Sequence, residues 1–310
     1  MRTRKKLVNG QEYYYLEESI RLEKPKVYSI FLGNRVPGAM ELGKARECLL
    51  DKIYRDLFGA AECIYLKKEQ LIESEKIRRR HERKMKLLGK AARDEKDEID
   101  MVNFVYTTLS TEGVPITRQD AGLAYRFGQK NVKNIRDESL RVALDMIKGL
   151  RYVKASRKGL TKGFVLELHK IIMSEYKEKN PGEFRTKQAY IYLKSYEKAE
   201  EIGFRPPAPQ EIGKLVSELV EWYNVEVGRL NPIELAALLH LRFYMIHPFE
   251  DGNKRISRLL LNKAFFDSSY PLVNISKDTQ EYFDALIRSV EKKDEKPFVQ
   301  FVLDRFVKYL

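Results

Sequence analysis

The sequence predicts a mainly α-helical protein with one β-hairpin among the helices and a small N-terminal segment that contains strands. Three observations lead to this prediction. Apolar residues recur every three or four positions over most of the chain after residue 40, which is the spacing of one helix face. Residues 184–195 depart from this spacing, because Ala189 and Ile191 alternate there with Tyr190 and Tyr192. The first 40 residues are rich in aromatic and β-branched residues, which favour strands.

The chain is predicted to consist of three parts. Residues 1–40 are predicted to form a pair of strands, EYYYLEESIRL and VYSIFLG, joined by the turn-like EKPK. Residues 41–100 form a helical and basic extension in this prediction, and residues 101–310 form one helical domain. The clearest helix start in that domain is Asn231, which is followed by Pro232 at the first helical position.

A formal net charge of +13 indicates either an anionic partner or a solvated basic surface. The basic residues are most concentrated in residues 76–93, so nucleic-acid binding through this stretch is one alternative. Because the chain lacks an uncharged apolar run of about 18 residues, we expect neither a membrane span nor a signal peptide. The two cysteines, Cys48 and Cys63, are too few for a disulfide framework, and a cytoplasmic location is expected.

Residues 247–258, HPFEDGNKRISR, carry the densest group of chemically useful side chains. One helical pattern ends before this segment and another begins within it, so the expected arrangement is helix, loop, helix. Gly252 and Asn253 fall at the start of the second helix, where free backbone N–H groups and the helix dipole favour an anion. Arg255 and Arg258 lie one turn apart on a shared face and can clamp further phosphate oxygens.

Two further residues of the segment suit phosphate chemistry. Asp251 offers a hard carboxylate oxygen for Mg²⁺, which binds through few carboxylates together with substrate phosphates. His247 stands at the other end of the loop, where its imidazole can accept a proton from a hydroxyl group that attacks the phosphate. His81, His169 and His240 lack such neighbours and are expected to be surface or structural residues.

The same segment resembles the H-x-F-x-[D/E]-G-N-x-R-x-x-R signature of Fic-domain proteins at seven specified positions: His247, Phe249, Asp251, Gly252, Asn253, Arg255 and Arg258. The resemblance extends to GEFR before the alternating stretch and to SRLLLN and PFVQF, so it covers most of residues 101–310. It implies a Fic-type helical bundle with a β-hairpin flap. The first hundred residues are not explained by it.

Fic-domain proteins transfer AMP from ATP to a Ser, Thr or Tyr hydroxyl of a target protein, and the resemblance implies the same activity here. It implies that ATP and Mg²⁺ bind, with His247 as the general base and Asp251 as the metal ligand. Gly252 and Asn253 would hold the α- and β-phosphates. Arg258 would contact the γ-phosphate, and Arg255 would support the same site.

The resemblance also implies roles outside the loop. The alternating stretch resembles the family's flap, which holds the target segment by main-chain pairing and here comprises Ala189, Tyr190, Ile191 and Tyr192. Asn262 and Tyr282 are candidates for the adenosine pocket, with a place in the core or at the surface as the alternative. A homodimer is one alternative for the oligomeric state.

Lys254 departs from the usual pattern, because the family core reads Gly-Asn-Gly-Arg and this sequence reads Gly-Asn-Lys-Arg. A branch that resembles the Doc toxins also has lysine there and transfers the γ-phosphoryl group instead. That branch usually carries alanine at the position of Gly252 and lacks the second arginine, whereas Gly252 and Arg258 are both present here. ATP binding through Lys254 with AMP transfer is therefore favoured. A kinase-like phosphoryl transfer and a solvent-facing Lys254 are the alternatives.

A second segment, residues 104–117, contains Thr108, Glu112 and Gly113 in the order [S/T]-x-x-x-E-[G/N]. This spacing also fits an ordinary helix that ends at Gly113. Within a Fic protein, such a motif before the catalytic core resembles the family's autoinhibitory helix, here over about residues 104–113 of the chain. Glu112 would then pair with Arg258 and deny the γ-phosphate its contact.

A non-enzymatic function is the remaining alternative. A degenerate Fic protein that acts as a regulator, binding nucleic acid through residues 76–93, would show the same basic composition. The intact motif at residues 247–258 favours the enzyme over this regulator.

Overall fold

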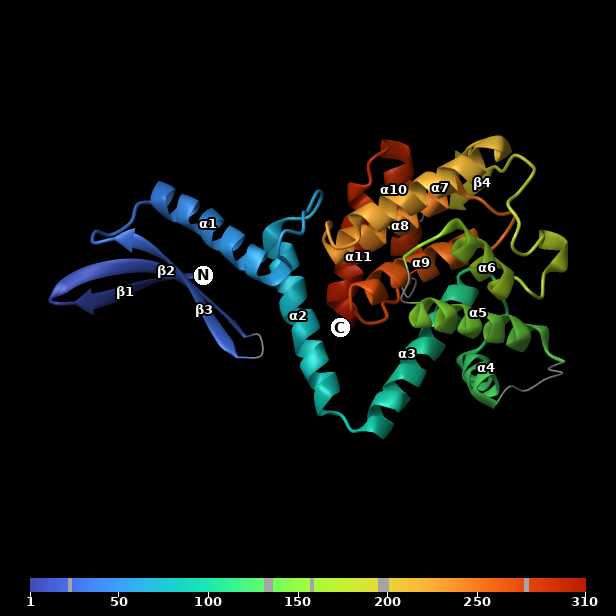
Figure 1. Cartoon of the computed structure of the whole chain (residues 1–310), viewed down its shortest axis with the longest axis horizontal. Helices are drawn as coiled ribbons and strands as arrows, with labels where there is room; N and C mark the ends of the chain where they lie inside the picture. The colour runs from blue at the N-terminus through green and yellow to red at the C-terminus, as the bar shows by residue number, and fades with distance from the viewer. Residues whose placement is uncertain (22–23, 131–135, 157–158, 195–200, 276–278) are drawn as a thin grey trace. The chain divides into compact units, whose positions relative to one another are not determined.

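The structure is a computed structural model of the whole chain, and it describes every residue except 22–23, 131–135, 157–158, 195–200 and 276–278. The chain divides into two compact units between Leu87 and Leu88. Helices make up most of the described residues, and strands occur as a small sheet in the first unit and a hairpin in the second (Figure 1). The predicted fold class, mainly helical with few strands, is confirmed.

Three antiparallel strands form the sheet of the N-terminal unit: β1 (Arg2–Val8), β2 (Gln11–Arg21) and β3 (Pro25–Gly33). β2 is the central strand, and its register places Tyr15 opposite Arg4 on one side and Phe31 on the other. The sequence predicted a pair of strands, which correspond to β2 and β3. The prediction therefore missed β1.

β1 carries no apolar alternation, because its residues, RTRKKLV, are mostly basic and are all exposed. Charge pairing with β2 supports the strand instead. Lys6 Nζ lies 2.8 Å from one carboxylate oxygen of Glu17, and Nη1 of Arg4 lies 3.4 Å from the other. Since Glu17 is itself buried, the two basic side chains neutralise a carboxylate that burial would otherwise destabilise.

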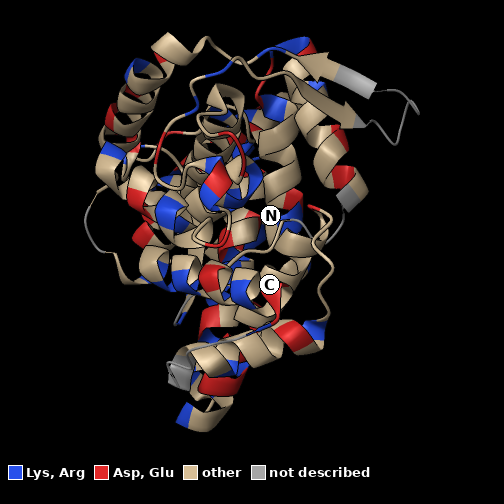
Figure 2. Ribbon diagram, turned by 90° about the vertical axis from the view of Figure 1, so that its right-hand side faces the viewer, with Lys and Arg blue, Asp and Glu red and all other residues tan. Residues whose placement is uncertain are grey.

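Helices α1 (Ala39–Phe58) and α2 (Lys68–Leu87) complete the unit. α2 contains the first part of the basic stretch, and much of its charge is paired within the helix. Nε of Arg78 and Nε of Arg79 lie 2.7 and 2.6 Å from the two carboxylate oxygens of the buried Glu75. Figure 2 shows basic and acidic residues together along the helices. Part of this positive charge therefore supports local structure, and nucleic-acid binding stays a prediction.

The C-terminal unit begins within the predicted extension, because its first helix crosses the predicted boundary between residues 100 and 101. The remaining helices follow in chain order: α3 (Lys90–Ser110), α4 (Arg118–Lys130), α5 (Glu138–Ala155), α6 (Lys162–Ile172), α7 (Pro209–Glu226), α8 (Pro232–Ile246), α9 (Asn253–Asp267), α10 (Thr279–Lys292) and α11 (Lys296–Tyr309). α8 is apolar on nearly all sides and is almost completely buried, which marks the core of the unit. The predicted cap is confirmed, since Oδ1 of Asn231 accepts a hydrogen bond from the Ile233 N–H at 3.0 Å.

The hairpin consists of β4 (Ile191–Lys194) and β5 (Glu201–Phe204), with Ile191 opposite Phe204. The hairpin predicted over residues 184–195 thus covers the first strand, and residues 195–200 of the connection lie outside the described residues. The alternation is present, because Tyr190 and Tyr192 are exposed while Ile191 is half-buried. These tyrosines lie on the solvent side of the hairpin.

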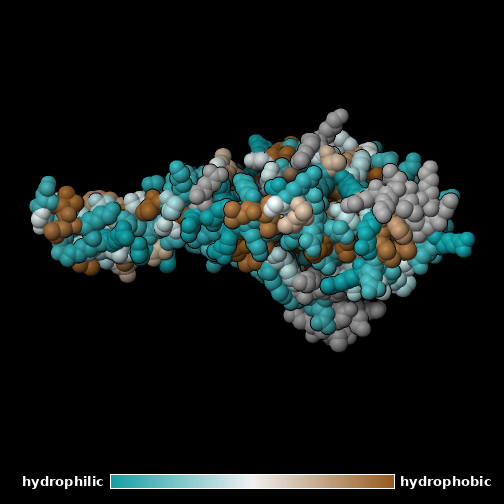
Figure 3. Space-filling model, turned by 90° about the horizontal axis from the view of Figure 1, so that it is seen from below, coloured by the Kyte–Doolittle hydropathy of each residue, from teal (hydrophilic) through white to brown (hydrophobic). Residues whose placement is uncertain are grey.

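Within the described ranges, no helix combines the length and the apolar character needed to cross a bilayer. Apolar side chains do reach the surface of the N-terminal unit. Figure 3 shows them as brown patches among hydrophilic residues at the left of the view. Exposed apolar residues of this unit are Leu7, Val8, Val27, Phe31, Val36, Met40, Ile64 and Leu87.

Candidate active site

The segment 247–258 forms the predicted helix-loop-helix between α8 and α9. Two residues with positive φ turn the loop: His247 (φ 50°, ψ 58°) ends α8, and Gly252 (φ 77°) precedes α9. Glycine is needed at position 252 for two reasons. Other residues rarely adopt this φ, and a Cβ added there would lie 2.9 Å from Sδ of Met173.

Asn253 closes the loop on itself. Its side-chain oxygen accepts a hydrogen bond from the Phe249 N–H at 3.0 Å, and its amide nitrogen donates to the Phe249 carbonyl oxygen at 2.8 Å. The Phe249 ring is fully buried, so it anchors the loop in the core. Because both ends of the Asn253 side chain are engaged, the phosphate contact predicted for Asn253 is left to its backbone N–H group.

The ring of His169 in α6 packs against the loop and stacks on the ring of Phe249, with 3.6 Å between the ring centroids. The Gly182 N–H donates to Nδ1 of His169 at 2.8 Å, so the ring proton lies on Nε2, which donates to the Asp251 carbonyl oxygen at 3.2 Å. Burial lowers the pKa of His169 to about 4 and keeps the ring neutral. The structural role predicted for His169 agrees with these contacts, but the sequence did not identify its partners.

Burial also lowers the pKa of His247 to about 4, and the positive charges of Arg185 and Lys254 lower it as well. The imidazole is therefore neutral at pH 7. Its Nδ1 lies 3.3 Å from the Tyr244 carbonyl oxygen, which can only accept a hydrogen bond. The proton thus resides on Nδ1, and Nε2 keeps the lone pair that a general base needs.

α9 places two buried guanidinium groups one turn apart. Arg258 is completely buried, and Arg255 is 3% exposed. Among the described residues, Nε and Nη2 of Arg258 and Nη1 of Arg255 have no hydrogen-bond partner, although Arg258 also stacks over the ring of Tyr282 at 4.6 Å. Buried N–H groups without acceptors are unfavourable, so this pair suits an anion that brings several oxygens.

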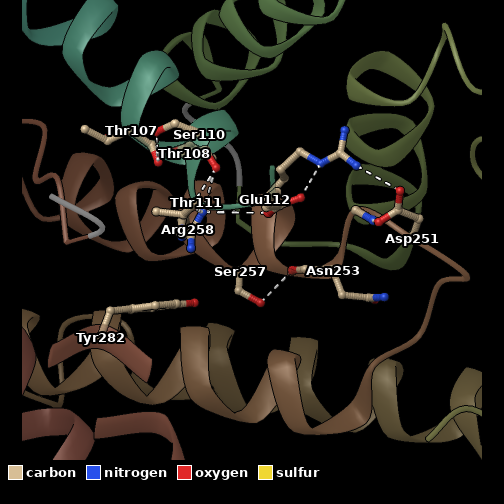
Figure 4. A network of polar contacts seen from close by, with 12 residues as sticks. Thr107, Thr108, Ser110, Thr111, Glu112, Asp251, Asn253, Ser257, Arg258 and Tyr282 are labelled. Carbon is tan, nitrogen blue, oxygen red and sulfur yellow. Dashed lines mark hydrogen bonds and ion pairs between the residues drawn. The ribbon is translucent and has the colours of Figure 1, made fainter. Parts of the chain in front are cut away.

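Glu112 reaches both arginines from the turn that follows α3 (Figure 4). One carboxylate oxygen lies 3.0 Å from Nε of Arg255, and the other lies 3.7 Å from Nη1 of Arg258. The glutamate side chain is only 8% exposed. The contact predicted between Glu112 and Arg258 is present, but the closer contact is with Arg255, which the sequence did not predict.

The rest of the 104–113 segment holds Arg258 through one carbonyl group and one hydroxyl group. Nη1 of Arg258 donates to the Thr108 carbonyl oxygen at 3.0 Å and to Oγ1 of Thr111 at 2.8 Å. Helix α3 ends at Ser110, earlier than predicted, and Gly113 then turns the chain with φ 79°. Thr108 therefore contacts Arg258 through its carbonyl group, and Thr111 is a contact that the motif did not identify.

Asp251 offers a carboxylate to a metal ion, since its side chain is 45% exposed and lies next to Gly252 and Arg255. Oδ1 accepts a hydrogen bond from the Gly252 N–H at 2.6 Å, and Oδ2 lies 3.1 Å from Nη2 of Arg255. A group of three metal-binding side chains does not occur in the described part of the chain. One carboxylate fits Mg²⁺, because this ion keeps several waters and binds chiefly with substrate phosphates.

The remaining predicted residues are half-buried or buried. Lys254 is half-buried, with Nζ 5.6 Å from the centre of the Phe283 ring, and burial lowers its pKa, so a solvent-facing lysine does not describe it. Asn262 and Tyr282 are fully buried. The Asn262 side chain bonds both the N–H and the carbonyl group of Val273, at 2.8 and 3.0 Å. Both residues thus occupy the core, which was the alternative to the adenosine pocket.

Comparison with known sequences agrees with the motif. Residues 159–265 match the family described as Fic/DOC. The chain is 32% identical over 205 residues to the protein adenylyltransferase Fic of Drosophila erecta and 31% identical to that of Drosophila melanogaster. Each match covers 64% of this chain and 39% of the relative, so the chain spans about two fifths of the length of these curated relatives.

Solved structures show the same fold. A Fic domain containing signaling protein from Bacteroides thetaiotaomicron matches with a TM-score of 0.63 and 27% identity, over 77% of this chain and 93% of that one. Fic-1 from C. elegans matches with a TM-score of 0.60 and 20% identity, over 88% of this chain and 76% of that one. The second likeness concerns the fold alone.

Proposed function

Because the chain contains a domain of the Fic/DOC family, we propose that it is a protein adenylyltransferase, which transfers AMP from ATP to a hydroxyl group of a target protein. One observation carries this proposal. The neutral His247 stands at one end of a loop, and the buried guanidinium groups of Arg255 and Arg258 follow its other end. A base for a hydroxyl group and a receptor for phosphate oxygens therefore share a single loop.

In the proposed step, Nε2 of His247 accepts the proton of the target hydroxyl group while the hydroxyl oxygen bonds to the α-phosphorus of ATP. The bond from the α-phosphorus to the oxygen that bridges it to the β-phosphorus breaks, and pyrophosphate leaves with that electron pair. The start of α9, at Gly252 and Asn253, would bind α- and β-phosphate oxygens. Arg258 would bind the γ-phosphate, and Arg255 would add charge to the same site.

Mg²⁺, bound with the nucleotide, would neutralise phosphate charge during this step. Asp251 would hold it, because its carboxylate is 45% exposed and directly precedes Gly252 and Asn253, the proposed phosphate site. The exposed edge of the hairpin near Tyr190 and Tyr192 would pair with the target segment.

We also propose that Glu112 inhibits the enzyme by competing with the nucleotide for the arginines. A carboxylate 3.7 Å from Arg258 meets the same positive charge that a γ-phosphate would need. The contact with Arg255 extends the inhibition, because Arg255 also contacts the carboxylate of Asp251. Glu112 thus occupies both arginines of the phosphate receptor, one of which also contacts the proposed metal ligand, and release requires only that one side chain leave.

A kinase-like transfer of the γ-phosphoryl group is the second candidate, and the half-buried Lys254 is the observation that favours it. Gly252 and Arg258 weigh against it. Alanine at position 252 would clash with Met173, and the buried Arg258 offers the γ-phosphate contact of the AMP-transfer orientation. A Lys254→Gly variant with faster AMP transfer would indicate that the lysine crowds the phosphates.

The two transfers are distinguished with labelled ATP. Protein carrying Glu112→Gly is incubated with Mg²⁺ and a lysate, in parallel with α-labelled and γ-labelled ATP. We expect protein bands that carry label only from the α position, and none when His247→Ala is added to the same protein. Bands labelled only from the γ position would refute AMP transfer.

A further inference from the structure

Arg185 is a buried cation that the function described above does not use. It lies in the GEFR sequence before the hairpin and is 3% exposed. Its backbone N–H donates to the Pro248 carbonyl oxygen at 2.9 Å. Its guanidinium group donates to three more carbonyl oxygens: Nε to His247 at 2.8 Å, Nη1 to Lys187 at 2.8 Å and Nη2 to Pro207 at 2.6 Å.

These four acceptors belong to two different parts of the site. His247 and Pro248 are the first residues after α8, and they begin the catalytic loop. Lys187 and Pro207 stand before and after the hairpin, at its base. The guanidinium group is planar, so its N–H groups diverge at fixed angles. Arg185 therefore sets the position of the hairpin base relative to the catalytic histidine.

The local electrostatics show that this position is not one that core packing alone would favour. Among the described residues, no carboxylate forms an ion pair with Arg185, and burial lowers its pKa. A buried cation without a carboxylate partner is unfavourable, and an apolar side chain of similar size would fill the space at less cost. The charge is stabilised by the three carbonyl groups and by the negative end of the α8 dipole, where His247 is the C-cap.

His247 benefits directly from this contact. Its backbone has φ 50° and ψ 58°, a left-handed conformation that a residue with a side chain adopts rarely. The carbonyl group of that residue is the acceptor for Nε of Arg185. The hydrogen bond to the His247 carbonyl group stabilises the left-handed backbone conformation of this residue. That backbone conformation sets the direction of the His247 imidazole.

A second contact strengthens the hairpin base. The side-chain amide of Gln188 donates to the Ala189 carbonyl oxygen at 3.0 Å and to the Pro206 carbonyl oxygen at 2.9 Å. Gln188 thus links the chain before β4 to the chain after β5, next to the contacts that Arg185 makes with Lys187 and Pro207. Gln188 does not contact the catalytic loop in any of these bonds, which separates its effect from that of Arg185.

We infer that Arg185 is a positioning residue that holds the hairpin and His247 in one register, so that a target segment paired along β4 presents its hydroxyl group to Nε2 of His247. This inference rests on the proposed function, because it assigns the hairpin to the target and His247 to the base. It predicts that Arg185 affects hydroxyl transfer and leaves nucleotide binding unchanged, since none of its bonds reaches Gly252, Asn253 or the arginines of α9.

The test uses the full chain with Glu112→Gly, to which Arg185→Lys is added. Lysine keeps the positive charge, but a single ammonium group cannot reach three carbonyl oxygens in the geometry of the fork. We expect the rate of auto-modification from α-labelled ATP, at saturating ATP, to fall at least tenfold, while the Kd for ATP changes by less than about twofold. We also expect faster hydrogen exchange at the amides of residues 189–193.

Arg305→Lys in the same background is the matched control. Arg305 of α11 is as buried as Arg185, at 4% exposed, and its ion-pair partner, Glu281, belongs to α10 and not to the catalytic loop. It reports the general effect of replacing a buried arginine. If Arg185→Lys matches this control in rate and in hydrogen exchange, the inference is overturned. An equal loss of ATP affinity and of rate would also overturn it, because Arg185 would then act on the nucleotide site.

Gln188→Ala keeps the inference testable if Arg185→Lys does not fold. Gln188 is only half-buried, and its loss loosens the hairpin base alone. We expect transfer to fall severalfold with ATP affinity unchanged, whereas an unchanged rate would count against the inference. If the Glu112→Gly protein transfers no label at all, the proposed function fails, and the hydrogen exchange of the hairpin still decides whether Arg185 couples the two parts.

Discussion

Replacing Glu112 with glycine removes the carboxylate that meets the two arginines of α9. In the structure this carboxylate lies 3.0 Å from Arg255 and 3.7 Å from Arg258, and it is nearly inaccessible to solvent. The gross attraction in each pair is on the order of 4 kcal/mol at the effective dielectric of a protein. Desolvation offsets much of that attraction, and the net value of a charge-assisted contact is about 1.5–3 kcal/mol.

A net value of this size corresponds to a tenfold to hundredfold change in the population able to bind ATP productively, at roughly 1.4 kcal/mol per factor of ten. We therefore expect Glu112→Gly to raise auto-modification by at least about tenfold. The assay follows incorporation of label from α-labelled ATP and Mg²⁺ into the purified chain. Glu112→Gln should activate nearly as much, because it removes the charge and keeps the size of the side chain.

Two controls separate inhibition from a general effect of glycine in this region. Glu95→Gly makes the same change at an exposed position of α3 and should leave the rate at the wild-type level. Glu112→Gly combined with Arg258→Ala should return to low activity, because the γ-phosphate contact is then missing. The reasoning is refuted if Glu112→Gly is no more active than the wild-type chain, since Glu112 would then only end a helix.

Four further predictions follow from the site. His247→Ala should abolish transfer and leave the Kd for ATP within about twofold, which ATP titrations check. The transfer rate of the Glu112→Gly protein should stay constant from pH 8 to about 5, because the pKa of His247 lies at about 4, and a pH profile of the rate checks this. His169 and the partly buried His247, both with pKa lowered from 6.5 to about 4, contribute stability that is present above pH 6.5 and is lost as pH falls toward 4, by about 2 kcal/mol each at pH 5. Urea unfolding at pH 7 and pH 5 should show this loss of stability, and a smaller loss in His169→Gln. Asn253→Ala should destabilise the chain by about 2–3 kcal/mol, since the Phe249 N–H and carbonyl group lose their partners; an unchanged unfolding midpoint would contradict the loop closure.

The sequence by itself determined the fold class and the catalytic loop. Helical spacing and the Asn231 cap placed α8, and the segment from His247 to Arg258 carries its residues so close together that one turn and one helix start bring them to one site. Contacts of this kind span few residues, so local backbone geometry fixes them. The positive φ of Gly252 is also a local feature, because the backbone must turn at this residue to enter α9.

Only the tertiary structure decided which distant groups meet. Arg258 and the Thr108 carbonyl group are 150 positions apart, and Arg185 and His247 are 62 positions apart, so no local spacing predicts either contact. Packing of α3 against α9 brought Glu112 closer to Arg255 than to the arginine that the motif suggested. The exposed, basic β1 has no periodic signal of its own and exists because β2 offers backbone partners and a buried Glu17. Long-range contacts of this kind depend on how whole helices and strands pack against one another. The pattern of side chains along the sequence does not predict which individual residues that packing brings into contact.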